Sequence, residues 1–397
     1  MRPGIVLQHG SERSLDTTKV RSDIAGFIGV IPQNRWPARV KPGDFIELPL
    51  FSYQELATNS ANRLFDAPTK RAVRAFFENG GLYCRLFALM VRSEQDLMVA
   101  NPFEDLFSPL IERMRGQEDI GILSMPVLGY IPIEFGAGNA VKIPCEPIWE
   151  MLLKHCQEMN NRFLIIDPPR DLHGPPLMSW VVRFRKKMKK AASFGAMYYP
   201  WLMSGDVEMP PSGTMAGLYA RLENEKNPFG VRWPPANIPL RGVTHPSSEV
   251  TWSEIADYTE CGVNPIILDK SRGVVSWGAR TLSEDDQWKH INTRRIVSYI
   301  REQLYRDSAW TVFENNSEEL WKIIERVIRF RLDDCAAGGL LAGDRNGNDY
   351  LVQCDRETNP TEVVNAGQIH VRVWIKPMST TERILVDMRI GSNDMIL

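Results

Sequence analysis

The residues best suited to chemistry lie in one short polar loop. Asp167 ends the strand candidate 162–167, and Asp171 and His173 follow it after two prolines. Carboxylates and an imidazole at the carboxyl end of a strand could transfer protons, because ligands of α/β proteins collect at that edge. A polar, proline-containing loop is also an ordinary way to leave a strand. The loop therefore supports an α/β enzyme as one hypothesis, with a plain surface turn as the alternative.

Patterns for cofactors and metals are incomplete. The segment 136–141 begins like a dinucleotide-binding loop but lacks its third glycine. The segment 344–355 imitates a calcium loop, yet Asp349 stands where the turn needs glycine and Asp355 replaces the final glutamate. The six cysteines show no close C-x-x-C pair, which is typical of reduced thiols in a cytoplasmic protein. Outside the loop at Asp167, Asp171 and His173, we therefore predict no catalytic, cofactor-binding or metal-binding residue, and no cofactor.

Charge and hydropathy argue against two further classes of protein, those that bind nucleic acid and those that insert into a membrane. The chain has 47 basic and 49 acidic residues, a net charge of −2, so no global charge favours nucleic acid or a membrane surface. A helix is expected over 178–192, and a solvated helix face explains its basic residues, with a binding site as the alternative. No window approaches the roughly 20 apolar residues that a membrane span needs, and no signal peptide is evident. We expect a soluble protein, made inside the cell, that neither inserts into a membrane nor binds nucleic acid directly.

The elements that would position these side chains indicate a mixed α/β fold. The apolar run 24–31 predicts a strand buried on both faces. A helix over 69–79 is followed by a strand over 82–91, and strands over 120–127 and 162–167 flank a helix over 147–158. Alternating strands and helices make residues 24–200 an α/β region.

The last third predicts two helices and then two strands. The helices span 293–306 and 317–341, and the second opens with Asn316 and Glu319 at a capping spacing. Strict alternation predicts two half-buried strands, which a plain hairpin would pair. Their apolar positions are Ile369, Val371, Val373 and Ile375 in the first run and Ile384, Val386, Met388 and Ile390 in the second.

The first 22 residues look unlike a domain. They are polar apart from a short strand candidate formed by Ile5, Val6 and Leu7. Extended, such a segment reaches roughly 70 Å. An extended arm and a frayed terminus are the two interpretations.

A series of short motifs runs from residue 25 to residue 355. They are AGFIG at 25–29, AVRAFFENGG at 72–81, AMYYPW at 196–201, PPSG at 210–213, AGLYAR at 216–221, PPAN at 234–237, LRG at 240–242, VNP at 263–265, WGARTL at 277–282, INTRR at 291–295 and CD at 354–355. By the order of these motifs, the sequence closely resembles contractile tail sheath proteins, which occur in contractile-tailed bacteriophages, R-type pyocins and phage-tail-like injection systems. The linker between WGARTL and INTRR is short. It leaves no room for the large outer domains of bigger phage sheath proteins, so the chain resembles a compact sheath protein.

The resemblance implies a structural subunit and not an enzyme. Such subunits polymerise as stacked six-fold rings around an inner tube, and the sheath contracts to drive the tube through a target envelope. The implied partners are further copies of the chain, the inner tube protein, and baseplate and terminal cap proteins. Assembly would take place in the cytoplasm, and the product would be a virion tail or a contractile particle that stays in the cell or is released.

The resemblance also implies a division of the chain and roles for particular residues. The expected division is an N-terminal arm over 1–22, an outer α/β region over 23–192, a tube-facing core region over 193–376 and a C-terminal arm strand over 377–397. Ile5, Val6, Leu7 and the run 383–390 would donate strands to neighbouring subunits, and the run 369–375 would belong to the acceptor sheet.

A helix in the C-terminal region would face the tube. Lys322, Arg326 and Arg329 lie at i, i+4 and i+7 of the helix over 317–341, or the adjoining segment 331–334 could serve. The core-facing positions would be Leu320, Ile324, Val327 and Ile328. The alternative is that Glu325 and Arg329 form a simple surface pair.

Overall fold

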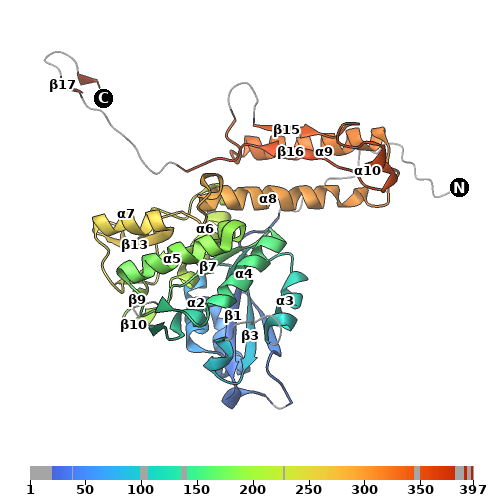
Figure 1. The fold of residues 1–397 in the computed structure, drawn as a ribbon. Coiled ribbons are helices and arrows are strands. Elements are labelled where there is room, and N and C mark those ends of the chain that lie inside the picture. Colours follow the sequence, from blue (N-terminus) through green and yellow to red (C-terminus); the bar gives the residue numbers. More distant parts are fainter. Residues whose placement is uncertain are drawn as a thin grey trace.

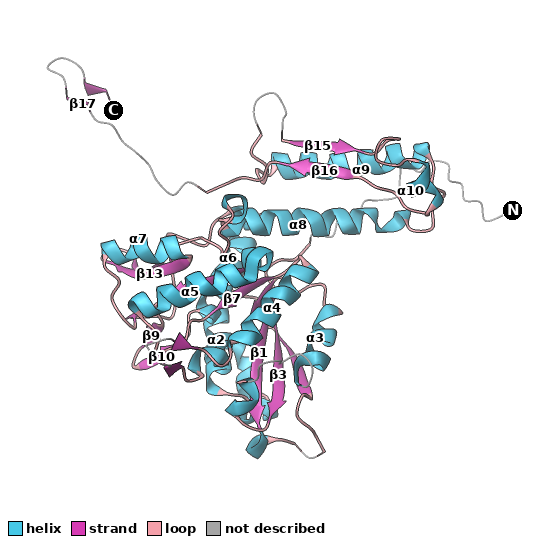
Figure 2. Ribbon diagram, in the orientation of Figure 1, coloured by secondary structure: helices cyan, strands magenta, loops and turns pink. Residues whose placement is uncertain are grey.

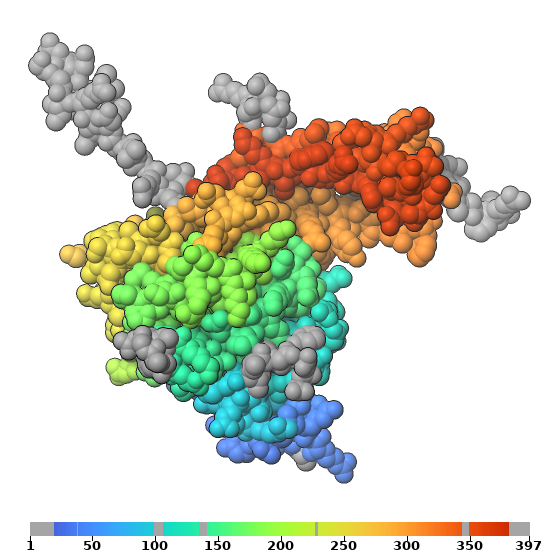
Figure 3. Space-filling view, in the orientation of Figure 1, coloured from blue at the N-terminus to red at the C-terminus, as the bar shows by residue number. Residues whose placement is uncertain are grey.

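The computed structural model describes residues 20–37, 39–98, 106–135, 141–226, 229–343, 349–380, 389–390 and 395–396. Within these residues the chain builds an α/β body and, along one end of it, a separate layer that contains the last two long helices (Figure 1). The body is the blue, green and yellow part of the space-filling view, and the layer covers it in orange and red (Figure 3).

The body is organised around a nine-stranded sheet with the order β11-β14-β13-β8-β7-β4-β1-β3-β2. The six strands from β13 to β3 run parallel, and the strands at both edges are antiparallel. The strands are β1 (Ala25–Pro32), β2 (Phe45–Leu50), β3 (Cys84–Val91), β4 (Ile122–Ser124), β7 (Phe163–Ile166), β8 (Gly195–Tyr199), β11 (Ile238–Pro239), β13 (Val263–Asp269) and β14 (Gly273–Ser276). Short strands β5 (Glu134–Phe135), β6 (Val141–Lys142), β9 (Leu202–Ser204), β10 (Val207–Met209) and β12 (His245–Pro246) form small sheets beside it.

Helices cover both faces of this sheet (Figure 2). On one face lie α1 (Tyr53–Thr58), α2 (Ala67–Glu78) and α6 (Ser212–Glu225), and on the other lie α3 (Ser108–Arg115), α4 (Glu146–Met159), α5 (Gly174–Met188) and α7 (Trp252–Cys261). The helices α2 and α6 pack closely because α6 has glycine at the contact. A Cβ atom at Gly213 would lie 2.4 Å from the Ala72 backbone, and one at Gly217 would lie 2.5 Å from the Phe76 carbonyl oxygen.

The mixed α/β architecture predicted from the sequence is confirmed, and most expected elements lie within a few residues of their predicted bounds. The start of α2 has a local cause, because the Asp66 side chain accepts a hydrogen bond from the Thr69 amide. The predicted division at residues 192 and 193, however, falls inside the sheet. Strand β7 pairs with β8 across it, and the sheet continues to Ser276. The architecture changes between Ser276 and the helix that begins at Ile291.

The second layer consists of α8 (Ile291–Ser308), α9 (Glu318–Ala337), α10 (Thr361–Asn365) and a two-stranded sheet of β15 (Tyr350–Gln353) and β16 (Arg372–Ile375). In Figure 2, α8 lies between the body and α9. A hydrophobic cluster of its own fills this layer, with Ile324, Ile328 and Leu332 of α9 at its centre. The predicted cap of α9 was wrong by one residue, because Ser317 caps the helix and the Asn316 side chain accepts from the Trp321 indole instead.

The predicted N-terminal arm over 1–22 needs correction at its last residues. Val20 and Ser22 were assigned to an arm outside the body, but both are buried, and Val20 packs in the cluster of the second layer. Of the second alternating run, the described residues form only β17 (Arg389–Ile390), which pairs with β18 (Met395–Ile396). The first run pairs with β15. Residues 381–388 lie outside the described residues, so the simple hairpin between the two runs stays a prediction.

Candidate assembly surfaces

The acidic loop after β7 does not assemble an active site. Asp167 is buried, and its Oδ1 accepts a hydrogen bond of 2.8 Å from the Ser212 amide at the start of α6. Asp171 and His173 are exposed, and the His173 ring contacts the Tyr199 hydroxyl at 3.3 Å. Asp167 therefore fixes β7 to α6, and the enzyme hypothesis loses the shared polar cleft that it needs. Within the described residues, no group of three or more His, Cys, Asp or Glu side chains is arranged to hold a metal ion.

Asp167 predicts a pH-dependent stability. Burial raises the pKa of its carboxyl to about 7, because the charged form loses its hydration. A carboxyl whose pKa is higher in the folded state destabilises the fold as pH rises through that value. We expect Asp167→Asn, which keeps the acceptor for Ser212, to be more stable than wild type by about 1–3 kcal/mol at pH 8, and this difference to vanish by pH 4. Urea unfolding at both pH values measures it, and a constant difference would contradict the assignment.

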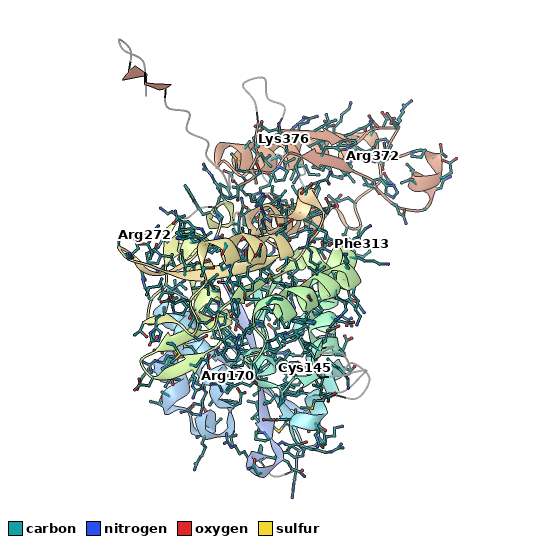
Figure 4. All side chains as sticks on the ribbon, turned by 60° about the vertical axis from the view of Figure 1, so that its left-hand side comes forward. Cys145, Arg170, Arg272, Phe313, Arg372 and Lys376 are labelled. Carbon is teal, nitrogen blue, oxygen red and sulfur yellow. The ribbon has the colours of Figure 1, made fainter. Side chains whose placement is uncertain are left out.

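The two-stranded sheet of β15 and β16 is the clearest surface for strand addition. Each strand has one partner within the described residues, so each keeps one unpaired edge. Side chains alternate along the predicted acceptor run as expected: Ile369, Val371, Val373 and Ile375 pack on the layer's core, and the intervening residues are exposed. In Figure 4, Arg372 and Lys376 lie in this layer and Arg170 lies on the body. The sheet thus offers edges that have no strand partner within the described residues, with the Val352 carbonyl oxygen of β15 already bonded to Arg329, and a face fixed by packing.

The proposed donor residues are only partly within the described residues. Ile5, Val6, Leu7, Ile384, Val386 and Met388 lie outside them, and Ile390 pairs with Met395 in the short β17–β18 ladder. Their role as inter-subunit strands stays a prediction.

The exposed face of α9 differs in one position from the predicted basic stripe. Lys322 and Arg326 are exposed and make no ion pair within the described residues. Arg329 instead turns to the layer, where it pairs with Glu325 at 2.7 Å and donates to the Val352 carbonyl oxygen at 3.0 Å. The surface pair that was the alternative is therefore present. Leu320, Ile324 and Ile328 are buried as predicted, and Val327 is half-buried.

Sequence reasoning missed the apolar part of this face. Phe330 is 59% exposed and lies four residues after Arg326, so the outward row reads Lys322, Arg326, Phe330. Ile323 is exposed beside it. The signal was available, because Phe330 lies well outside the stripe of Leu320, Ile324 and Ile328 on a helical wheel. The α9 face, defined as Lys322, Ile323, Arg326 and Phe330, is thus basic and apolar together.

Comparisons with known proteins agree with this architecture. Residues 283–391 match the phage tail sheath C-terminal domain family, which covers α8, α9 and the β15–β16 sheet. The tail sheath protein of Salmonella phage ViI is 23% identical over 267 residues, and that of Vibrio phage KVP40 is 22% identical over 191 residues. These matches cover 63% and 47% of this chain but only 41% and 27% of the two phage proteins, so the chain spans less than half of their length.

Solved structures match nearly the whole chain. The sheath of the extracellular contractile injection system PVC, in its contracted state, superposes with a TM-score of 0.71 at 23% identity over 94% of both chains. The contracted helical sheath of the anti-feeding prophage gives 0.69 at 22% identity over 95% of both chains. The chain therefore has the fold of contractile-sheath subunits. Its C-terminal part is similar to the phage tail sheath C-terminal domain, and the curated proteins that it matches are named tail sheath proteins.

Proposed function

We propose that this chain is the structural subunit of a contractile sheath. Copies would polymerise as stacked hexameric rings around an inner tube, and the sheath would contract to drive the tube through a target envelope. The observation that supports this most strongly is the agreement of nearly the whole chain with sheath subunits in the contracted state. Energy for contraction would be stored in a metastable extended assembly and released as contacts between bodies increase.

Strand addition supplies the connection between subunits in this proposal. The run 383–390 and the segment Ile5, Val6, Leu7 of neighbouring copies would pair with the open edges of β15 and β16. Main-chain hydrogen bonds would give affinity, and the alternation along 369–375 would fix the register. The bodies could then slide and rotate while the strands keep the subunits connected.

The remaining partners follow from the same role. They are the inner tube protein, a baseplate and a terminal cap, and a solved relative is itself part of the anti-feeding prophage baseplate. Assembly would take place in the cytoplasm. None of the described helices is long and apolar enough to cross a membrane.

Electron microscopy of the purified protein tests the proposal. Wild-type subunits should form tubes in negative stain, and a helical reconstruction should show β15 or β16 paired with a strand from another copy. A discrete monomer or dimer at all concentrations would contradict the proposed function.

The α9 face is our candidate for contact with the inner tube. We expect Lys322→Glu with Arg326→Glu to leave sheath-only polymers intact and to weaken tube-loaded particles roughly tenfold, because paired charges across an interface set its strength and salt dependence. Co-sedimentation of tube and sheath at increasing salt measures this.

A matched control separates this effect from a change of net charge. Lys41→Glu with Lys270→Glu reverses two exposed lysines of the body and should leave tube loading unchanged. A reconstruction in which Lys322 and Arg326 point away from the lumen would refute the contact.

A further inference from the structure

The first described residues of the chain are held in a polar seam between the two parts of the molecule. Residues 20–24, which we call the arm root, connect the N-terminal segment to β1. The Val20 amide donates to Gln303 Oε1 at 3.3 Å, and Arg295 Nη2 donates to the Ser22 carbonyl oxygen at 3.1 Å. Both partners lie on α8, two turns apart. On the other side of the arm root, the Gly121 amide donates to the Ile24 carbonyl oxygen at 3.0 Å.

The arm root and Gly121 are in close backbone contact. A Cβ atom at Gly121 would lie 2.6 Å from the Ser22 carbonyl oxygen, so no larger residue fits there without a shift. Arg295 reaches the same carbonyl from α8 and stacks on Tyr219 of α6, with its guanidinium carbon 4.9 Å from the ring centre. The backbone of the arm root is therefore fixed from two sides, and not only covered by apolar side chains.

A buried hydrogen-bond relay continues from this contact into α9. Gln303 Nε2 donates to Asp307 Oδ1 at 3.3 Å, and Arg331 donates to both oxygens of Asp307 at 2.6 and 3.0 Å. Gln303, Asp307 and Arg331 are 0%, 2% and 9% exposed. The orientation of the Gln303 amide is determined chemically. An amide N–H can only donate and a carboxylate can only accept, so Oε1 must face Val20 and Nε2 must face Asp307.

Such a relay lowers the stability of the fold unless every member keeps its partner. A buried polar group without a partner has lost its hydrogen bonds to water, and no protein group replaces them. Apolar packing alone would hold the arm root but would permit it to slide along α8. Directional bonds to Val20 and Ser22 select one position. A change in the position of either the arm root or α9 therefore disturbs the same group of bonds.

We propose that Arg295 and Gln303 form a clamp that fixes where the N-terminal arm leaves the body, and that the Gln303–Asp307–Arg331 relay couples this clamp to α9. The inference deepens the proposed function and rests on it, because in a sheath the arm carries the pull of a neighbouring subunit. The clamp transmits that force to α8, whose N-terminal half is buried against the body. The relay then connects the clamp to α9, which carries the candidate tube contact. Arg295 and Gln303 are positioning residues in this role.

Limited trypsin digestion of the unassembled subunit tests the clamp directly. Arg21 is a trypsin site, and its bond to Ser22 lies within the arm root. In wild type this bond should resist cleavage at temperatures well below global unfolding. Gln303→Leu and Arg295→Met each remove a bond to the arm root, and we expect cleavage after Arg21 to rise roughly tenfold, since opening becomes easier by about 1.4 kcal/mol. Mass spectrometry of the fragment that begins at Ser22 gives the rate.

Two further variants separate the clamp from general loosening. Arg301→Met changes an exposed residue of the same helix and should leave the rate unchanged. The bonds of Arg331 in the relay go to Asp307 and not to the arm root, so Arg331→Met should raise cleavage after Arg21 by a smaller factor. An unchanged rate in Arg331→Met would overturn the coupling, and an unchanged rate in Gln303→Leu would overturn the clamp.

Hydrogen exchange of the wild-type subunit covers the case in which a variant fails to fold. The Val20 amide should exchange as slowly as amides in the middle of α8. Exchange at the rate of a free peptide would overturn the clamp without any substitution. Neither experiment requires polymer, so a wild type that forms no tubes would refute the proposed function and leave the clamp measurements standing. In tubes, Gln303→Leu should leave subunits joined but increase breakage on contraction, and breakage at the wild-type frequency would overturn the mechanical role.

Discussion

Removal of residues 1–19 is expected to give a folded subunit that cannot build a connected sheath. The described core begins at Val20, so this deletion removes none of the packing among the described residues. It does remove Ile5, Val6 and Leu7, which we propose as a strand for a neighbouring subunit. Thermal unfolding should stay within a few degrees of wild type, because a change below about 1 kcal/mol shifts the midpoint only slightly. Negative-stain microscopy should show rings or short stacks in place of long tubes.

A second deletion provides the control that the structure calls for. Removing residues 1–22 also takes away Val20 and Ser22, with their bonds to Gln303 and Arg295. This version should lose stability by about 2–4 kcal/mol, because a buried apolar side chain and two hydrogen bonds are lost. Normal tubes from the shorter deletion would refute the role of the arm in connecting subunits. Equal stability of the two deletion variants would refute the contribution of the arm root to the stability of the fold.

Replacement of Asp307 by alanine is expected to destabilise the folded subunit strongly. Asp307 is 2% exposed and receives two hydrogen bonds from Arg331 and one from Gln303. Its removal leaves a guanidinium buried without its main partner, and breaking a buried pair in this way costs about 3–5 kcal/mol. Urea unfolding of the subunit gives the value.

Asp334→Ala is the matched control, since Asp334 pairs with the same arginine at 3.7 Å but is half exposed. We expect a loss below about 1 kcal/mol there, because solvent screens an exposed pair. Adding Arg331→Met to Asp307→Ala should recover part of the stability, because the unpaired charge is then gone. A loss in Asp307→Ala as small as that in Asp334→Ala would show that the buried pair contributes little.

The local elements were predictable where one short stretch contains all the information. The helix α2 was predictable from its apolar spacing and its glycine stop, and the alternation of residues 369–375 gave the correct inward positions. The class of protein was predictable in a different way, because the order of many short motifs along the chain is specific although none of them is specific alone. Both kinds of signal are independent of which segments meet in space.

The sequence by itself therefore determined the α/β character, the main helices, the inward face of the acceptor run and the resemblance to sheath subunits. Tertiary structure alone decided that β15 pairs with β16, that the sheet crosses residues 192 and 193, and that Arg329 turns to Glu325 and Val352. It also decided that Val20, Ser22 and Asp167 are buried. The reason is physical. The periodicity of a sequence indicates which side of a helix or strand is apolar. Contacts between segments far apart in the chain determine which strand pairs with a given edge and which group binds a given arginine or carboxylate.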